Sequence, residues 1–304
     1  MYCSGRAYAK LNLTLNVNGL RQDGYHEMEM IMQTVSLYDS VTVETNTGAP
    51  WCVTCDGDLP SGPENLAWKA AEAFYAASGQ PDCGVRITIK KRIPAQAGMA
   101  GGSADAAAVL RLLNSCYGNP LTVAELCNVA EKTGSDVPFC VVGGTALVLG
   151  RGERICPLPP LPPCHFVLCR PDFSVSTPEM FRELDSSGIT ERPDTAAALS
   201  ALKTGSLPGL GRQLRNVFES LALIRHPQAE RARQVFRNTG ALGCCMTGTG
   251  SVFYGLYDRK GAAGAALNAL TEHFADVWYA EPVWPEALQK NTRFSIPVPA
   301  EAAG

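Results

Sequence analysis

Residues 94–107 read P-A-Q-A-G-M-A-G-G-S-A-D-A-A, a glycine-rich loop that continues directly into an alanine-rich helix. The segment V-R-I-T-I-K-K before it places apolar residues at alternate positions, as a strand does. Small residues between a strand and a helix let an anion approach the backbone, where free N–H groups and the helix dipole attract it. Residues 94–107 therefore predict a phosphate-binding loop, and Ser103 could cap the helix or face a metal ion or phosphate oxygen.

The glycine cluster alone is equally compatible with a tight turn before an ordinary core helix. Its sequence matches neither G-x-x-x-x-G-K-[ST] nor G-x-G-x-x-G, so the two commonest nucleotide-binding motifs are absent. Other motifs in the chain are needed to distinguish a phosphate-binding loop from a tight turn.

The composition excludes several classes of protein. With 304 residues, 46% hydrophobic and 18% charged, the chain can bury a large core and is predicted to form two domains. Its net charge of −3, without a basic cluster, argues against a nucleic-acid partner. The first residues lack a signal-peptide pattern, and the longest apolar stretch (137–149) is interrupted by glycines. We therefore expect a cytoplasmic protein with no membrane partner.

The twelve cysteines have irregular spacing. Cys52-x-x-Cys55 has no second pair at zinc-site spacing, and the adjacent Cys244 and Cys245 cannot easily bridge each other. We expect the cysteines to be reduced and to serve as small buried hydrophobes. Metal binding by Cys52 and Cys55 is the minor alternative.

The N-terminal segment predicts a long strand. Apolar residues from Ala7 to Val17 alternate with polar ones, so Lys10 and Asn12 point the same way, onto a polar face. Such a face is ordinarily solvated, but the stretch that follows favours a functional role for it. The turn-rich stretch G-L-R-Q-D-G-Y-H (19–26) then places Tyr25 beside His26.

Local signals mark several helices. Asn65 is expected to cap a helix over 66–78 that Gly79 ends, and Thr122-x-x-Glu125 is a capping box for a helix ending near 133. Asp136, in G-S-D-V-P-F, could be another cap, which is the favoured reading in isolation, or a functional carboxylate.

Further elements follow a proline-rich stretch at 151–164, which we expect to join two domains spanning 1–155 and 156–304. A strand is expected at 165–170, helical segments within 193–239 and a long helix at 261–274. Between them, M-T-G-T-G-S (246–251) is a second glycine loop, suited to close approach by a ligand or by the first loop.

Three motifs now occur in a fixed order: A-K-L-N-L (9–13), P-A-Q-A-G-M-A-G-G-S-A-D-A-A and M-T-G-T-G-S-V-F (246–253). Together they resemble the superfamily named for galactokinase, homoserine kinase, mevalonate kinase and phosphomevalonate kinase, the GHMP kinases. R-Q-D-G-Y-H-E-M and G-S-D-V-P-F are similar to the branch that phosphorylates a cytidylylated methylerythritol in the non-mevalonate isoprenoid pathway.

The resemblance implies an α+β, two-domain GHMP kinase fold: an N-terminal domain like the second domain of ribosomal protein S5 and a C-terminal ferredoxin-like domain. It also implies transfer of the ATP γ-phosphoryl group to the 2-hydroxyl of a small molecule that carries a cytidine diphosphate group. Mg²⁺ is expected, without assigned protein ligands, and the protein is expected to be a monomer or weak homodimer.

Residue roles follow from the same resemblance. Lys10 and Asp136 match the catalytic pair. Five positions match substrate-binding residues: Asn12, Tyr25, His26, Thr177 and Phe181. The positions that match ATP-binding residues are Asn65, Lys91, Pro94, Ala95, Gln96, Ala97, Gly98, Met99, Ala100, Gly101, Gly102, Ser103 and Ala104.

These residue types suit the chemistry. An alcohol is a weak nucleophile, so a carboxylate such as Asp136 is useful as a base, and Lys10 could keep it ionised. Phosphoryl transfer otherwise needs positioning and charge neutralisation, which backbone N–H groups and Mg²⁺ supply. Tyr25 and Phe181 could sandwich a cytosine ring, and His26 could bind the base by a hydrogen bond.

The loop departs from the family pattern. Gln96, Ala97 and Ala100 stand where the family commonly has glycine or another very small residue. Ala100 matters most if that position requires a positive φ, where a Cβ costs about 1 kcal/mol.

Three alternatives remain at this stage. Another GHMP kinase, of the homoserine or mevalonate type, is disfavoured by D-G-Y-H. A non-catalytic nucleotide-binding protein of the same fold is disfavoured by the Lys10–Asp136 pair. A decarboxylase with a similar fold is a remote third.

Overall fold

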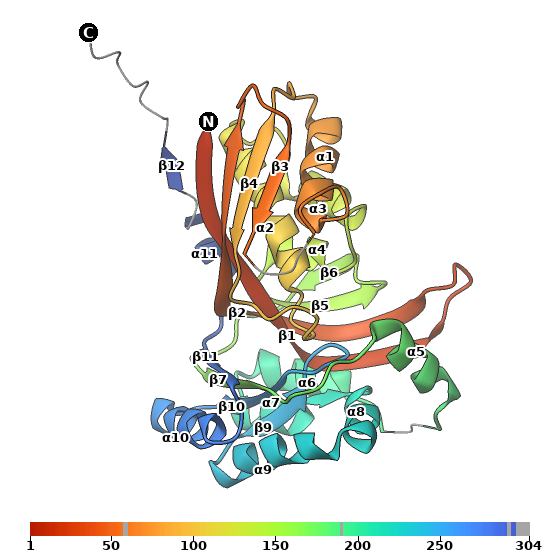
Figure 1. Cartoon of the computed structure of the whole chain (residues 1–304). Coiled ribbons are helices and arrows are strands. Elements are labelled where there is room, and N and C mark those ends of the chain that lie inside the picture. The colour runs from red at the N-terminus through yellow and green to blue at the C-terminus, as the bar shows by residue number, and fades with distance from the viewer. Residues whose placement is uncertain (57–59, 189–190, 291–292, 296–304) are drawn as a thin grey trace.

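A computed structural model describes residues 1–56, 60–188, 191–290 and 293–295, which form two lobes (Figure 1). The strands of the first lobe are β1 (Tyr2–Leu20), β2 (His26–Thr45), β3 (Cys52–Cys55), β4 (Val85–Lys90), β5 (Thr145–Gly150) and β6 (Arg154–Pro157). Its helices are α1 (Leu66–Ser78), α2 (Gly101–Cys116), α3 (Val123–Glu131) and α4 (Val137–Val142).

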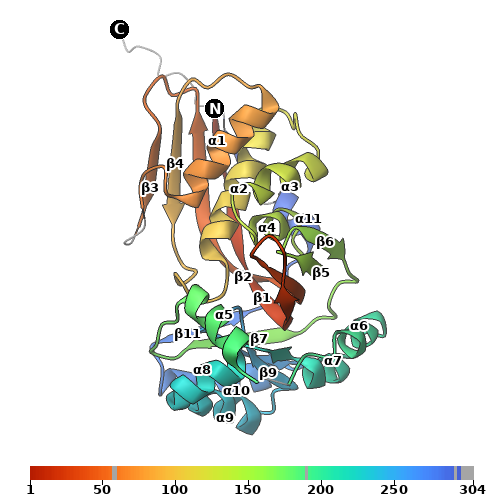
Figure 2. The same cartoon turned by 90° about the vertical axis from the view of Figure 1, so that its right-hand side faces the viewer.

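The first sheet is built around the long hairpin of β1 and β2. Because β2 is so long, it pairs with β4 through residues 40–45 and with β5 through residues 28–33. β3 extends the sheet by pairing parallel to β4, and β6 pairs with β5. Helix α2 contacts β1 and β2 directly, and α1 and α3 pack beside it (Figure 2). This arrangement places the start of α2 beside the middle of β1.

The second lobe contains β7 (His165–Arg170), β9 (Gly243–Met246), β10 (Phe253–Tyr257) and β11 (Asp276–Ala280). Its helices are α5 (Thr177–Ser186), α6 (Thr195–Lys203), α7 (Leu207–Gln213), α8 (Glu219–Arg225), α9 (Glu230–Asn238) and α10 (Lys260–Thr271). The sheet order is β11-β7-β10-β9, with antiparallel neighbours. Helical crossovers before β9 and before β11 give the β-α-β-β-α-β arrangement of a ferredoxin-like domain.

The local helix signals are confirmed with one correction. Asn65 accepts a hydrogen bond from the Ala67 amide, Gly79 takes the left-handed conformation, and the Thr122–Glu125 capping box is formed. Of the two predicted roles of Ser103, the helix cap is wrong, because α2 already begins at Gly101. Ala100 is the N-cap instead, with no side-chain hydrogen bond.

The polar face of β1 is buried, unlike an ordinary polar strand face, which is solvated. Lys10, Asn12 and Thr14 are at most 4% exposed, as buried as the apolar residues between them. The polar face is covered because the second lobe packs on it: the Tyr254 hydroxyl donates to the Asn12 carbonyl at 2.8 Å. β1 also pairs with β8 (Arg215–Asn216) of that lobe. A polar face that alternation assigns to solvent therefore forms the junction between the lobes.

The cysteine prediction is partly wrong. Cys3 and Cys116 form a disulfide that connects β1 to the end of α2, so not all cysteines are reduced. The spacing gave no hint of this pair because 113 residues separate them. Four of the free cysteines are buried as expected: Cys140, Cys164, Cys169 and Cys245.

The chain passes between the lobes twice. The first passage, 158–164, follows β6 and lies within the predicted proline-rich connection. After β11 the chain returns, and α11 (Pro285–Lys290) and β12 (Arg293–Ser295) join the first lobe, β12 by pairing with β1. The domain boundary at 155/156 stays a prediction, and residues 296–304 of its second part lie outside the described residues.

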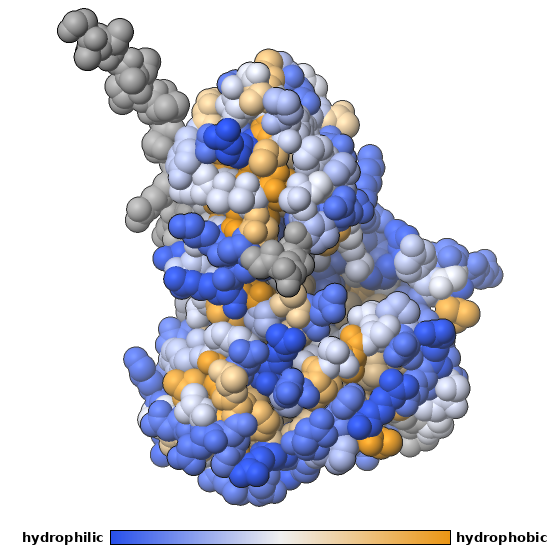
Figure 3. Space-filling model, in the orientation of Figure 1, coloured by the Kyte–Doolittle hydropathy of each residue, from blue (hydrophilic) through white to orange (hydrophobic). Residues whose placement is uncertain are grey.

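The surface agrees with the balanced composition. On the face shown in Figure 3, hydrophilic and apolar residues of the described part of the chain are interspersed. Among the described residues, no helix has the length and apolar character needed to cross a membrane.

Candidate active site

The two glycine loops meet at the junction of the lobes. The Val252 amide donates to the Ala97 carbonyl at 3.4 Å, and the Thr247 hydroxyl donates to the Gly98 carbonyl at 3.2 Å. A Cβ on Gly98 would lie 2.0 Å from the Thr247 carbonyl oxygen, so only glycine permits this approach. The second glycine loop therefore supports the first, which was one of its two predicted uses.

The first glycine loop has positive φ values at two residues that are not glycine, which strains its backbone. Gln96 and Ala100 have φ values of 52° and 56°, in the left-handed region that disfavours a Cβ. Ala100 therefore has the positive φ at which its Cβ is expected to cost about 1 kcal/mol. Between these two residues, Gly98 also has a positive φ, of 78°.

A buried cluster of charges fastens the loop at its base. The Lys91 ammonium contacts the carboxylates of Asp39 and Asp105, the latter at 2.6 Å. Asp39, fully buried, also accepts hydrogen bonds from the backbone amides of Arg92 and Ile93. The cluster joins the end of β4 to the first turns of α2, so it sets the path of residues 91–105.

The protonation of this cluster reflects its burial. Burial raises the pKa of Asp105 to about 7, Lys91 opposes the rise, and neighbouring Asp39 adds to it. Burial alone would lower the pKa of Lys91, but the two carboxylates raise it above its ordinary value. Two acids therefore share one cation, and the Oδ1 atom of Asp105 has no hydrogen-bond partner among the described residues.

Lys10 and Asp136 face each other at the junction. The Lys10 ammonium lies 3.7 Å from Asp136 Oδ2 and donates to Asn12 Oδ1 at 2.7 Å. Asp136 precedes α4 but its side chain makes no capping hydrogen bond, which removes the cap interpretation. Its side chain is 29% exposed, so the carboxylate is accessible while Lys10 is buried.

A cavity of about 660 Å³ brings these groups together. Lys10 and Asp136 line it with the loop residues Gln96, Gly98 and Ala100. From the second lobe come the start of α5 and the second glycine loop, where the hydroxyls of Thr177 and Thr249 lie 2.9 Å apart. Of the predicted substrate residues, Thr177 and Phe181 line this cavity.

Tyr25 and His26 lie in an adjoining cavity of about 650 Å³, which shares Met28, Ser135, Arg151, Thr177, Pro178 and Phe181 with the first. The His26 ring stacks on Phe181 with centroids 4.6 Å apart, and its Nε2 atom lies 3.0 Å from Asp185. Tyr25 is 58% exposed. Because His26 stacks on Phe181, a base held between Tyr25 and Phe181 stays a prediction.

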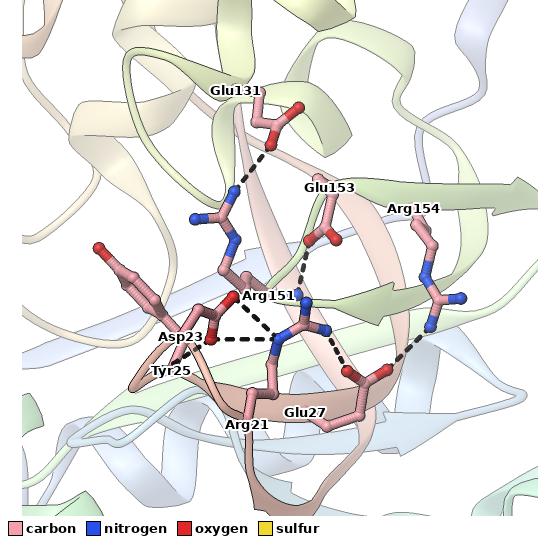
Figure 4. Close-up of polar contacts among 8 residues, drawn as sticks. All are labelled: Arg21, Asp23, Tyr25, Glu27, Glu131, Arg151, Glu153 and Arg154. Carbon is pink, nitrogen blue, oxygen red and sulfur yellow. Dashed lines mark hydrogen bonds and ion pairs between the residues drawn. The ribbon is translucent and has the colours of Figure 1, made fainter.

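Arg151 connects the two cavities. Its guanidinium lies over the Tyr25 ring, 5.0 Å from the centroid, and pairs with Glu131 at 2.8 Å (Figure 4). Around the hairpin turn, Arg21 pairs with Asp23 and Glu27, and Glu27 also pairs with Arg154 (Figure 4). These ion pairs stabilise the turn that presents Tyr25.

Two predicted ATP-binding residues have internal partners. Asn65 caps α1 and donates to the Pro60 carbonyl at 2.6 Å, while Lys91 is held in the charge cluster. Neither lines the cavity that contains Lys10 and Asp136. Their contact with adenine stays a prediction.

Sequence reasoning missed three groups that shape the site: Arg151, the Asp39–Asp105 carboxylates and Thr247. Arg151 carried a readable signal, since it is a cation directly after the strand that follows Asp136. Asp39 carried none, because its partners Lys91, Arg92 and Ile93 are distant in sequence. Thr247 lies in the second glycine loop, which was predicted to approach the first, but its contact with the Asn12 amide at 3.0 Å was not predicted.

Comparison with known proteins agrees with this geometry. The profile of the GHMP kinases N terminal domain matches residues 65–144, and that of the GHMP kinases C terminal matches residues 198–276. A 4-diphosphocytidyl-2-C-methyl-D-erythritol kinase of Caldicellulosiruptor saccharolyticus is 41% identical over 87% of this chain and 91% of its own length. The enzyme of that name from Carboxydothermus hydrogenoformans is 43% identical, over 87% and 92%.

The chain belongs to the 4-diphosphocytidyl-2-C-methyl-D-erythritol kinase family. A crystal structure of 4-(cytidine 5'-diphospho)-2C-methyl-D-erythritol kinase superposes with a TM-score of 0.77 at 36% identity, covering 92% of this chain and 98% of that one. A homoserine kinase from Cytophaga hutchinsonii superposes with a TM-score of 0.74 at 19% identity, covering 92% and 94%, and shares the fold. The predicted α+β, two-domain GHMP kinase fold is confirmed.

Proposed function

We propose that this chain transfers the γ-phosphoryl group of ATP to the 2-hydroxyl of 4-diphosphocytidyl-2-C-methyl-D-erythritol, with Asp136 as the base. The observation that carries the proposal is the Lys10–Asp136 pair, 3.7 Å apart in a cavity lined by the glycine loop. Family membership supports the substrate, because the relatives that match most of this chain carry that enzyme name.

The geometry suggests how each group would act. Asp136 would accept the hydroxyl proton, and Lys10, held by Asn12, would stabilise negative charge on the attacking oxygen. The loop amides between Gln96 and Ala100 would bind the ATP phosphates at the start of α2. The Asp136 carboxylate would need to approach within hydrogen-bond distance of the substrate, as catalytic groups commonly do only once the ligand binds.

The substrate would extend from one cavity into the next. Its reacting hydroxyl belongs at Asp136 and its cytosine at the aromatic residues Tyr25, His26 and Phe181. The diphosphate between them would then pass Arg151, a residue that lines both cavities. A planar guanidinium suits phosphate recognition.

Mg²⁺ is proposed with ATP. Magnesium keeps several waters and is commonly bound through substrate phosphates with one or two protein oxygens. Among the described residues there is no group of three acidic, histidine or cysteine side chains able to hold an ion. The Ser103 hydroxyl, in the first turn of α2, is the protein oxygen that we propose as a ligand. Bound Mg²⁺ would neutralise charge on the phosphates.

One assay tests the proposal. The protein is incubated with ATP, Mg²⁺ and one of four acceptors: the cytidylylated methylerythritol, 2-C-methyl-D-erythritol 4-phosphate, homoserine or mevalonate. ADP release is expected only with the first. Equal turnover of homoserine or mevalonate would assign the chain to another GHMP kinase activity, and turnover of none would favour a non-catalytic nucleotide-binding protein.

A further inference from the structure

A second cavity lies in the first lobe, away from the catalytic groups. Its volume is about 770 Å³, larger than the catalytic cavity, with which it shares no lining residue. It is bounded by α2, α3, the end of α4, residues 157–160 and α11. Much of its wall is apolar, contributed by Val123, Leu126, Val141, Leu158, Trp284 and Leu288.

Arg111 of α2 is the cation on this wall. Its guanidinium donates to two backbone carbonyls, those of Cys140 at 2.5 Å and Arg6 at 3.3 Å. It forms no ion pair with a carboxylate in the described part of the chain, although Glu286, an exposed residue, lines the same cavity. Burial lowers the pKa of Arg111 to about 10, so it remains charged at neutral pH.

A cation without a counter-ion beside an apolar wall suits a ligand that has an acidic group and an apolar body. Carbonyl oxygens satisfy some of the guanidinium donors but bring no negative charge, and an arginine has further N–H groups for a carboxylate or phosphate. An apolar body next to that acid would cover the exposed hydrophobic surface, including the 40% exposed Trp284.

We propose that this cavity binds a small amphipathic anion, a carboxylate or phosphate joined to an apolar body, with its acidic group on Arg111. Arg111 connects the two helices that begin beside the catalytic groups. Arg111 lies on the helix that begins at the phosphate loop, and it holds the carbonyl of Cys140 on the helix that begins after Asp136. The ligand would therefore bind against the two helices that position the catalytic groups.

The test uses Trp284 fluorescence of the full chain, titrated with n-octyl phosphate and, separately, with octanoate. Inorganic phosphate and 1-octanol supply the head group and the apolar body alone. We expect saturable quenching by at least one of the two anions, at concentrations at least tenfold below those needed for 1-octanol or inorganic phosphate. Trp284→Phe should remove the signal, which assigns it to this cavity.

Two variants that each introduce an acid, one on the cavity wall and one away from it, test whether the anion binds in this cavity. Val123→Asp places an acid on the wall at a 53% exposed position in the first turn of α3, where an acid suits the helix dipole. Ile224→Asp makes the same change at a 77% exposed position that does not line the cavity. Val123→Asp should weaken anion binding at least fivefold, and Ile224→Asp should leave it unchanged.

The proposal fails if neither anion binds saturably, if 1-octanol binds as tightly as the anions, or if both variants behave like the wild type. Because the readout is binding and not turnover, these outcomes are independent of whether the chain phosphorylates the proposed substrate.

Discussion

Asp136 is the single side chain on which the proposed chemistry depends most. Asp136→Asn keeps the shape but removes the base, so kcat should fall about 10²–10⁴-fold. Thermal stability should change little, because the carboxylate makes no capping hydrogen bond. Steady-state kinetics and a melting curve measure both quantities. A variant that keeps more than about a third of wild-type kcat, well outside that range, would show that Asp136 is not the base.

Ala100 tests the cost of a Cβ in the phosphate loop. Its φ of 56° lies in the left-handed region, where a Cβ costs about 1 kcal/mol. Ala100→Gly should relieve that strain and give an equal or lower KM for ATP. The greater freedom of glycine in the unfolded chain costs about 0.5–1 kcal/mol, so the melting temperature should change little.

Ala106→Gly is the matched control, because Ala106 is buried in the helical part of α2 and has no such strain to relieve. It should lower stability without improving the KM for ATP. A severalfold rise in the KM of Ala100→Gly would mean that the methyl group of Ala100 makes a contact the loop needs.

Tyr25 tests the substrate end of the site. Its exposed ring, under the Arg151 guanidinium, is available to stack on a base. Tyr25→Ala should weaken binding of the cytidylylated substrate by about 1–3 kcal/mol and leave the affinity for an ATP analogue unchanged. Separate calorimetric titrations of the two ligands distinguish this from general damage, which would weaken both equally.

Among the structural elements, the charge cluster beneath the loop should make stability depend on pH. The pKa of Asp105 rises from its ordinary value of 3.8 to about 7 in the folded chain, mainly through burial. A folded carboxyl that holds its proton more tightly contributes stability below its ordinary pKa, and that contribution is lost as the pH rises towards the folded value. The raised pKa of Lys91 affects stability only at alkaline pH, above the ordinary Lys91 pKa of 10.5.

Asp105→Asn removes this titration while leaving Lys91 paired with Asp39. The stability of the variant relative to the wild type should therefore increase between about pH 4 and pH 7 and level off above that. Urea unfolding at a series of pH values measures the difference. A constant difference across that range would contradict the titration assigned to Asp105.

The same elements show what the sequence could predict. Asn65, Gly79 and the Thr122–Glu125 pair act within one helical turn, so they located α1 and the start of α3 correctly. The charge cluster was not predicted because Lys91 meets Asp39 across 52 residues, which no local pattern shows. Likewise, alternation revealed that β1 has two faces but not that the second lobe buries the polar one.

For the molecule as a whole, the contact between the two glycine loops is a junction that a single added methyl group should disrupt. Gly98→Ala would place a Cβ 2.0 Å from the Thr247 carbonyl, whereas Gly79→Ala meets no atom within 4 Å. Both residues have positive φ, so each variant should lose about 1 kcal/mol to backbone strain.

Only Gly98→Ala should lose more than that and also lose most of its turnover, because the lobes must separate to admit the methyl group. Melting temperatures and ATP-dependent turnover of the two variants give the comparison. Equal losses for both would mean that the approach of the loops is not required for the site.

The junction of the lobes also has a consequence for synthesis on the ribosome. Lys10 and Asn12 leave the ribosome early, yet the groups that cover Asn12, Thr247 and Tyr254, lie 235 and 242 residues further along the chain. N-terminal regions begin to fold while translation continues. The nascent first lobe should therefore keep its central strand partly wet and its active site incomplete until Thr247 and Tyr254 have emerged from the ribosome.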